Sequence, residues 1–122
     1  MEERSGKRVF VRNRTRNTVL ADAAEVADTS EKRRTGLLKH ERLDAGQGLW
    51  IVPCESVHSF FMKFAIDLIY LDRNKKVRKV RHRMAPWRLS MCLTAHSILE
   101  LPAGAAAATG TQAGDQLEIE EQ

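Results

Sequence analysis

The sequence predicts an α+β fold, a single compact β-rich domain spanning residues 1–122. Its length of 122 residues suits one hydrophobic core. Short β-rich runs alternate with turn-forming residues rather than with crossover helices, which favours a curled or barrel-like, mostly antiparallel sheet with one or two short helices. Hydrophobic residues make up 43% and charged residues 30%, a globular balance that excludes a disordered chain.

The first half of the chain predicts a hairpin, a helix and a strand. Apolar runs at 8–12 and 19–27 flank a polar turn, as the two strands of a hairpin do. The segment 28–40 opens with Asp-Thr-Ser-Glu, which can satisfy the first free amides of a helix, so we expect a surface helix there. Residues 49–52 are rich in β-forming side chains and end at a proline, which predicts a short strand.

The second half predicts the centre of the core. Residues 60–62 and 66–71 are apolar on both strand faces, which is typical of an interior strand. A turn and a basic β-rich run follow, so residues 66–82 predict a hairpin. The alanine-rich segment 102–110 predicts a short helix that ends at a glycine. Further strands are expected at 95–101 and 116–120.

The charge is distributed unevenly along the chain, although the net charge is only +4. Residues 73–88 contain eight basic side chains and no acid, whereas residues 100–122 contain five acids and no base. Such a basic block attracts nucleic acid, an acidic small molecule or another protein. Tyr70 and Trp87 flank it and could stack on bases, so residues 73–88 are a possible nucleic-acid-binding surface. Alternatively, the acidic strand lies beside the basic hairpin and neutralises it.

The sequence predicts a cytoplasmic protein that does not enter a membrane. Residues 1–16 are basic and lack the apolar stretch of a secretory signal. No run approaches the roughly 18 to 20 apolar residues that cross a bilayer. The two cysteines, Cys54 and Cys92, are expected to be free thiols, since a secreted scaffold of this length would usually carry more.

Two cysteine–histidine spacings suggest chemistry. Cys54-x3-His58 and Cys92-x3-His96 together could supply four ligands to a tetrahedral zinc ion, if the two segments meet in space. Alternatively, the Cys54 thiolate could act as a nucleophile with His58 as its base, which would make the protein a thiol-dependent enzyme. The structural alternative is that Cys54 is a small buried hydrophobic residue and His58 lies in a turn. No other cofactor is predicted.

Two carboxylates lie within apolar strands and need an explanation. Asp67 is surrounded by apolar residues, and a buried ionised carboxylate is unfavourable unless it is paired or hydrogen-bonded. We expect it to have a fixed partner, either Lys63 or backbone amides, or else a reacting proton, which makes Asp67 a catalytic candidate. Glu100 poses the same question, and strand alternation places it on the face of His96.

A series of motifs points to a known family. In chain order, they are Thr35-Gly36-Leu37-Leu38, Gly48-Leu49-Trp50-Ile51, Pro53-Cys54-x3-His58, Ser59 to Lys63, Ile66-Asp67, Pro86-Trp87-Arg88, Leu99 to Gly104 and Gly114-Asp115. Over residues 19–119 the chain resembles the uncharacterised bacterial and archaeal family called domain of unknown function 192. It is similar to the branch that has the Pro-Cys-x3-His element. The resemblance implies a compact β-rich domain with small helices and no established activity.

The leading hypothesis is a binding domain for a small, anionic ligand. Its cleft would be built from the loop after Pro53 and the segments 62–63 and 86–88. Lys63 and Arg88 supply positive charge, while Phe61 and Trp87 supply apolar contact, a mixture typical of small-molecule pockets. Cys54, His58 and Asp67 are the catalytic candidates of the enzyme alternative. The sequence does not predict the oligomeric state.

Overall fold

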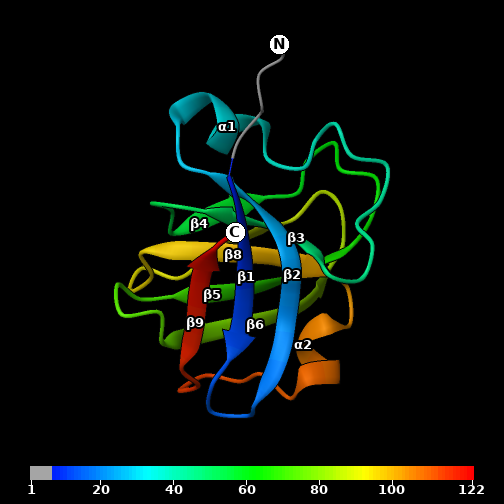
Figure 1. Ribbon diagram of the computed structural model, residues 1–122. Coiled ribbons are helices and arrows are strands. Elements are labelled where there is room, and N and C mark those ends of the chain that lie inside the picture. Colours follow the sequence, from blue (N-terminus) through cyan, green and yellow to red (C-terminus); the bar gives the residue numbers. More distant parts are fainter. Residues whose placement is uncertain (1–6) are drawn as a thin grey trace.

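The computed structural model describes residues 7–122 and confirms the predicted α+β fold, with a strongly curled sheet and two short helices (Figure 1). The first six residues of the basic segment 1–16 lie outside the described part. None of the helices in residues 7–122 is long and apolar enough to cross a membrane. The elements are β1 (Arg8–Asn13), β2 (Thr18–Ala27), α1 (Ser30–Thr35), β3 (Gln47–Ile51), β4 (Ser56–His58), β5 (Ile66–Leu71), β6 (Val77–Met84), β7 (Leu89–Met91), β8 (Ser97–Pro102), α2 (Ala105–Thr109) and β9 (Leu117–Glu121).

The main sheet has seven strands in the order β6-β5-β8-β3-β2-β1-β9. Its pairs are antiparallel, except that β2 and β3 run parallel. The sheet curls until its two edges meet at one end, where the Val77 amide donates to the Asp115 carbonyl at 2.8 Å. This contact explains the barrel-like shape. A separate two-stranded ribbon, β4–β7, packs outside the main sheet.

The two faces of the sheet each carry a hydrophobic core, because successive strand residues point to opposite faces. Strand β8 shows this directly. Leu99 and Leu101 join the inner cluster, in which β5 and β8 face β1 and β2 across the curl. Ile98 joins the outer cluster, which is covered by Leu37 after α1 and by Val57 of the ribbon. Every residue of β5 is buried, as expected for an interior strand.

The structure differs from the sequence-based predictions in three places. The helix expected over 28–40 ends at Thr35, because Gly36 takes a positive φ of 49° and turns the chain so that Leu37 is buried. Residues 60–62 form a turn rather than an interior strand. The strand β4 forms in a segment whose polar residues gave no strand signal. The short helix within 102–110 is present as α2 and ends at Gly110, as predicted.

Candidate functional site

Asp67 is held by backbone amides. Its side chain is buried in β5, and its two oxygens accept hydrogen bonds from the amides of Arg83 at 2.8 Å, Gly104 at 3.1 Å and Ala106 at 2.9 Å. The carboxylate therefore links the end of β6 to the start of α2. Of the two kinds of partner expected for it, the structure shows the backbone amides rather than Lys63.

Lys63 and Arg88 line none of the three hollows described within residues 7–122. The Lys63 ammonium donates to the Glu41 carboxylate at 2.7 Å, and this hydrogen bond lowers the pKa of Glu41. Both side chains are largely exposed. The Arg88 guanidinium donates to the carbonyls of Pro86 and Trp87 at 3.4 and 3.3 Å. These contacts are local ones on the surface.

Phe61 and Trp87 lie next to each other, as expected for two residues of one predicted cleft. Their ring centroids are 4.6 Å apart, and both side chains are exposed. None of the three hollows described within residues 7–122 is lined by Phe61, Lys63, Trp87 or Arg88. The predicted ligand-binding residues therefore form two surface features, an aromatic pair and separate cations, rather than one shared cleft.

Cys54 and His58 are not arranged as a nucleophile and its base. The Cys54 thiol donates to the Ser56 carbonyl at 3.1 Å, and burial raises its pKa, whereas an activated thiol needs a lowered one. The Nδ1 atom of His58 accepts a hydrogen bond from the Phe60 amide at 3.2 Å, and its ring stacks on Phe60. This geometry gives the thiol-dependent alternative no support.

The two Cys/His segments meet, but their side chains do not form a metal site. The Cys54 amide donates to the His96 carbonyl at 2.7 Å, and the Cys92 amide donates to the Glu55 carbonyl at 2.9 Å. Within residues 7–122, however, no group of three or more His, Cys, Asp or Glu side chains is placed to hold a metal ion. The backbones of the two segments are therefore adjacent, but the side chains of Cys54, His58, Cys92 and His96 are not gathered as ligands of one zinc ion.

Glu100 has the most unusual environment of the buried carboxyl groups. It lies in β8 between Leu49 of β3 and Leu68 of β5, and it is 4% exposed. Its Oε1 atom has no hydrogen-bond partner. Removal from water disfavours the ionised form and raises the pKa of Glu100 to about 8. The side chain is therefore mostly a neutral acid at pH 7, able to donate one hydrogen bond and to accept others.

Glu100 lines a hollow of about 300 Å³, which we call the Glu100 hollow. Its other lining comes from the end of α1 and the residues that follow it, from the end of β3, from Cys54 and from β4. Apolar walls are supplied by Leu37, Leu38, Ile51 and Val57. Polar groups are supplied by Arg33, Arg34, Cys54 and His58. An unpartnered acid, a thiol and two guanidinium groups thus line one partly apolar space.

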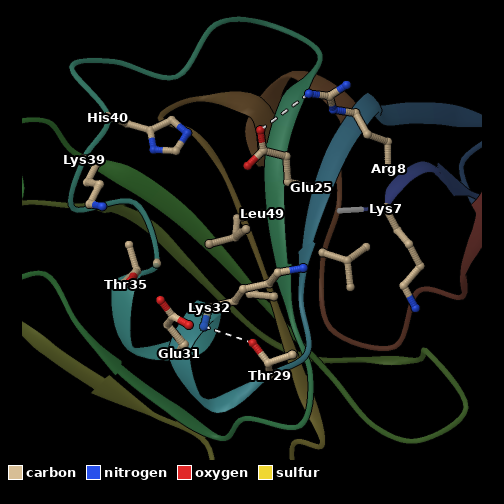
Figure 2. Close-up of a pocket in the computed structure, with 13 residues that line it drawn as sticks. Lys7, Arg8, Glu25, Thr29, Glu31, Lys32, Thr35, Lys39, His40 and Leu49 are labelled. Atoms are coloured by element: carbon tan, nitrogen blue, oxygen red, sulfur yellow. Dashed lines mark hydrogen bonds and ion pairs between the residues drawn. The ribbon is translucent and has the colours of Figure 1, made fainter. Parts of the chain in front are cut away.

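A larger hollow of about 580 Å³ lies on the other side of α1 and shares Thr35 and Gly36 with the Glu100 hollow. Figure 2 shows Leu49 between Lys39 and His40 on one side and Arg8 and Glu25 on the other. Arg8 is already paired with Glu25 at 3.7 Å. The Nδ1 atom of His40 is buried without a partner. The short α1, none of whose side chains is buried, is the partition between the two hollows.

The acidic strand makes its ion pairs with cations other than those of the basic segment 73–88. Strand β9 pairs with β1, and Glu118 and Glu121 lie within ion-pair distance of cations on or beside β1. Within residues 7–122, no ion pair involves a cation of 73–88. These ion pairs therefore give no support to the alternative in which the two ends cancel, although the sheet edges β6 and β9 meet at one end.

The sequence pointed to some of these residues and missed others. Glu100 was noted as a carboxylate in an apolar strand, but it was not placed in a site. Arg33, Arg34 and Leu37 were missed as site residues, because they belong to the segment predicted to be one surface helix. The early stop at Gly36 was the available signal, since a glycine near the middle of a predicted helix suggests close packing or an end.

Comparisons with known proteins agree on one family. The model of the DUF192 family, described as "Uncharacterized ACR", matches residues 11–119. A UPF0127 protein of Thermococcus sibiricus is 32% identical over 118 residues, which cover 90% of this chain and 75% of the relative. A UPF0127 protein of Pyrococcus horikoshii is 32% identical over 112 residues, which cover 86% of this chain and 94% of the relative.

Two solved structures share the fold at 20% sequence identity. One is a protein of unknown function from Novosphingobium aromaticivorans, with a TM-score of 0.78 over 91% of this chain and 83% of that chain. The other is described as a putative transcription regulator from Sinorhizobium meliloti, with a TM-score of 0.82 over 97% of this chain and 98% of that chain. At this identity the likeness concerns the fold alone.

Proposed function

Because this chain belongs to DUF192, a family of uncharacterised function, we propose a function from its own geometry: it binds a small molecule in the Glu100 hollow. The ligand carries a hydrogen-bond-donating group, such as an ammonium, that reaches Glu100. It also carries an anionic group that Arg33 and Arg34 attract. The proposed ligand is anionic, as the sequence predicted, but the site differs from the predicted cleft around Lys63 and Arg88.

The observation that carries the proposal is the unpartnered Oε1 atom of Glu100. More than about 90% of buried polar groups are hydrogen-bonded, and leaving one unpartnered costs about 1–3 kcal/mol. A ligand that donates to this oxygen recovers that energy. The hollow of about 300 Å³ is at the lower end of the range of about 300–1,000 Å³ found for ligand pockets.

The surrounding charges favour a ligand with two opposite groups. Arg33 and Arg34 lie at the basic end of α1, and guanidinium groups hold carboxylates and phosphates through paired hydrogen bonds. The same hollow also has apolar lining, with Leu38 and Val57 half-buried against the outer core. A short hydrocarbon chain with an amine at one end and an acid at the other can contact Glu100, the apolar lining and the arginines.

The test is a series of ω-amino acids: glycine, β-alanine, 4-aminobutyrate and 6-aminohexanoate. We expect one length to raise the melting temperature and to give saturable heat in titration calorimetry. Butyrate and butylamine, which each lack one of the two groups, should bind at least 10-fold more weakly. Glu100→Gln should remove most of the gain, and Glu120→Gln, on the exposed end of β9, should not.

Two outcomes would overturn the proposal. One is that no ω-amino acid of the series raises the melting temperature. This holds if the concentrations tested reach 50-fold above those at which a control protein that binds such a compound responds. The other is that Glu100→Gln binds the best ligand as well as the wild type does. A ligand present at 100 times its Kd adds about 2.7 kcal/mol to the free energy of unfolding, so a real effect is measurable.

We also propose two finer assignments. The chain belongs to the branch of the family with the Pro53-Cys54-x3-His58 element, and an alignment of family members in which that element does not define a group would contradict this. Its location is cytoplasmic, which the two free thiols support, because a reducing compartment keeps thiols unpaired. Fractionation of cells that express the tagged full-length protein tests the location.

A further inference from the structure

A strip of large apolar side chains faces solvent beside the β4–β7 ribbon. It consists of five residues that are 55–72% exposed: Phe61, Trp87, Leu89, Met91 and Leu93. Four of them are odd-numbered residues of the segment 87–93, whose centre is the strand β7. Ser90, between Leu89 and Met91, is buried, and its hydroxyl lies 2.6 Å from the Tyr70 hydroxyl. We call these five residues the apolar strip.

The backbone holds the aromatic end of the strip in an unusual conformation. Phe61 and Trp87 have positive φ angles of 68° and 67°, a region that residues other than glycine rarely occupy. Ser59 is buried between their two loops and holds them together. Its hydroxyl donates to the Ala85 carbonyl at 2.6 Å and accepts from the Arg88 amide at 2.9 Å. The exposure of these rings is therefore a fixed property of the fold.

Two cations that form no ion pair within residues 7–122 border the strip. Lys79 donates to the Met91 carbonyl at 2.8 Å, and Arg81 donates to the Leu89 carbonyl at 3.4 Å, so both side chains lie along β7. Both line a hollow of about 350 Å³ together with Leu89 and Met91. Residues 73–99 contain no acid at all. The strip and its border thus form one apolar and strongly basic surface.

We propose that the apolar strip docks on an anionic lipid surface. Leu89, Met91 and Leu93 match hydrocarbon, and tryptophan favours the boundary between hydrocarbon and water. Basic side chains beside inserted apolar groups are attracted to anionic headgroups. The sequence predicted no membrane contact because no segment can span a bilayer, and peripheral docking needs no spanning segment.

Charge complementarity fits both an anionic membrane and nucleic acid, so side-chain type decides between them. Both carry negative charge and would be attracted to the cations of 73–88. Nucleic acid uses stacking on rings, and the strip offers only Phe61 and Trp87 for it. The three aliphatic side chains have no role in stacking, whereas they have a direct role in lipid. The lipid surface therefore accounts for the whole strip.

The test is co-flotation of the full chain with vesicles of phosphatidylcholine alone or with 30% phosphatidylglycerol, at 50 and 500 mM NaCl. We expect binding to the anionic vesicles at low salt that falls at least 10-fold at high salt or without phosphatidylglycerol. The double substitution Leu89→Ser/Leu93→Ser should reduce binding at least 10-fold. Val19→Ser, which removes an exposed apolar side chain on β2, is the matched control and should bind as the wild type does.

Three results would overturn the inference. The first is no binding to anionic vesicles at 50 mM NaCl, and the second is equal binding by the Leu89→Ser/Leu93→Ser protein. The third is a dimer in sedimentation velocity that the Leu89→Ser/Leu93→Ser substitutions abolish, because the strip would then be covered by a second copy of the chain. Tight binding of oligo(dT) with no vesicle binding would assign the surface to nucleic acid instead. Circular dichroism and thermal melts confirm that the variants fold, which their exposed positions favour. None of these readouts depends on the Glu100 hollow.

Discussion

Glu100 should make the stability of the protein fall as the pH rises. The pKa of its carboxyl is about 8 in the folded protein and about 4.5 when it is exposed to water. Between these values the folded state keeps a proton that the unfolded state has lost. Since stability rises with pH only where the unfolded state binds more protons, it must fall here. The contribution is fully present below about pH 4.5 and is lost as the pH rises through about 8.

The size of the effect follows from the two pKa values. They differ by about 3.5, and each unit corresponds to about 1.4 kcal/mol, so the full loss is about 5 kcal/mol. The slope within this window is about 1.4 kcal/mol for each pH unit. A small domain has a free energy of unfolding of only about 5–15 kcal/mol, so this one group changes a large part of it.

Urea unfolding at each pH unit from 5 to 9, under a reductant, measures the effect. The matched variant is Glu100→Gln, which keeps the shape and cannot ionise. The difference in free energy of unfolding between Glu100→Gln and the wild type should grow by several kcal/mol across this range, in favour of the variant at high pH. Glu120→Gln, at an exposed position, should follow the wild-type curve. A difference for Glu100→Gln that stays constant within 1 kcal/mol would refute the reasoning.

Three further substitutions test the framework around the site by urea unfolding. Asp67→Asn should cost about 2–4 kcal/mol, because one amide oxygen replaces a buried carboxylate to which three backbone amides donate, and a cost below 1 kcal/mol would contradict this. Gly48→Ala should cost about 1–3 kcal/mol, because its new Cβ would lie 2.9 Å from the Glu100 carbonyl oxygen; an unchanged stability would show that β3 can shift. Ser59→Ala should cost about 1–3 kcal/mol and should also change tryptophan fluorescence, whereas a loss of stability with an unchanged spectrum would show that the aromatic end of the strip is held by other contacts.

The fold was predictable to the extent that its signals are local. The hairpin over 66–82 follows from a short turn between two β-rich runs, and the strand pairing is as expected. The β4–β7 ribbon was not predictable, because the pairing of Ser56 with Met91 joins polar or isolated apolar residues that are far apart in the chain. The helix limit depended on the single residue Gly36, whose conformation is set by the burial of the next leucine.

The candidate site was likewise predictable only where its signals are local in the sequence. The apolar sequence around Asp67 correctly required a fixed partner, but its partners come from residues 83, 104 and 106, which only the curled sheet brings to β5. Glu100 has the same kind of sequence neighbourhood, and its Oε1 atom has no hydrogen-bond partner within residues 7–122. Sequence pattern therefore identifies a buried carboxylate and cannot distinguish a satisfied one from an unsatisfied one. That difference depends on which distant amides reach it.

The parallel pairing of β2 and β3 has an evolutionary consequence. Two adjacent parallel strands cannot be joined by a tight turn, so the chain must return along the outside of the sheet, here through residues 28–46. This return segment lines both hollows, and so does β3, whereas β8 lines only the Glu100 hollow. Insertions and substitutions in the return segment can therefore alter the shape and charge of the hollows without disturbing the strands beneath. Descendants of one ancestral scaffold could diversify in what they recognise and still fold alike.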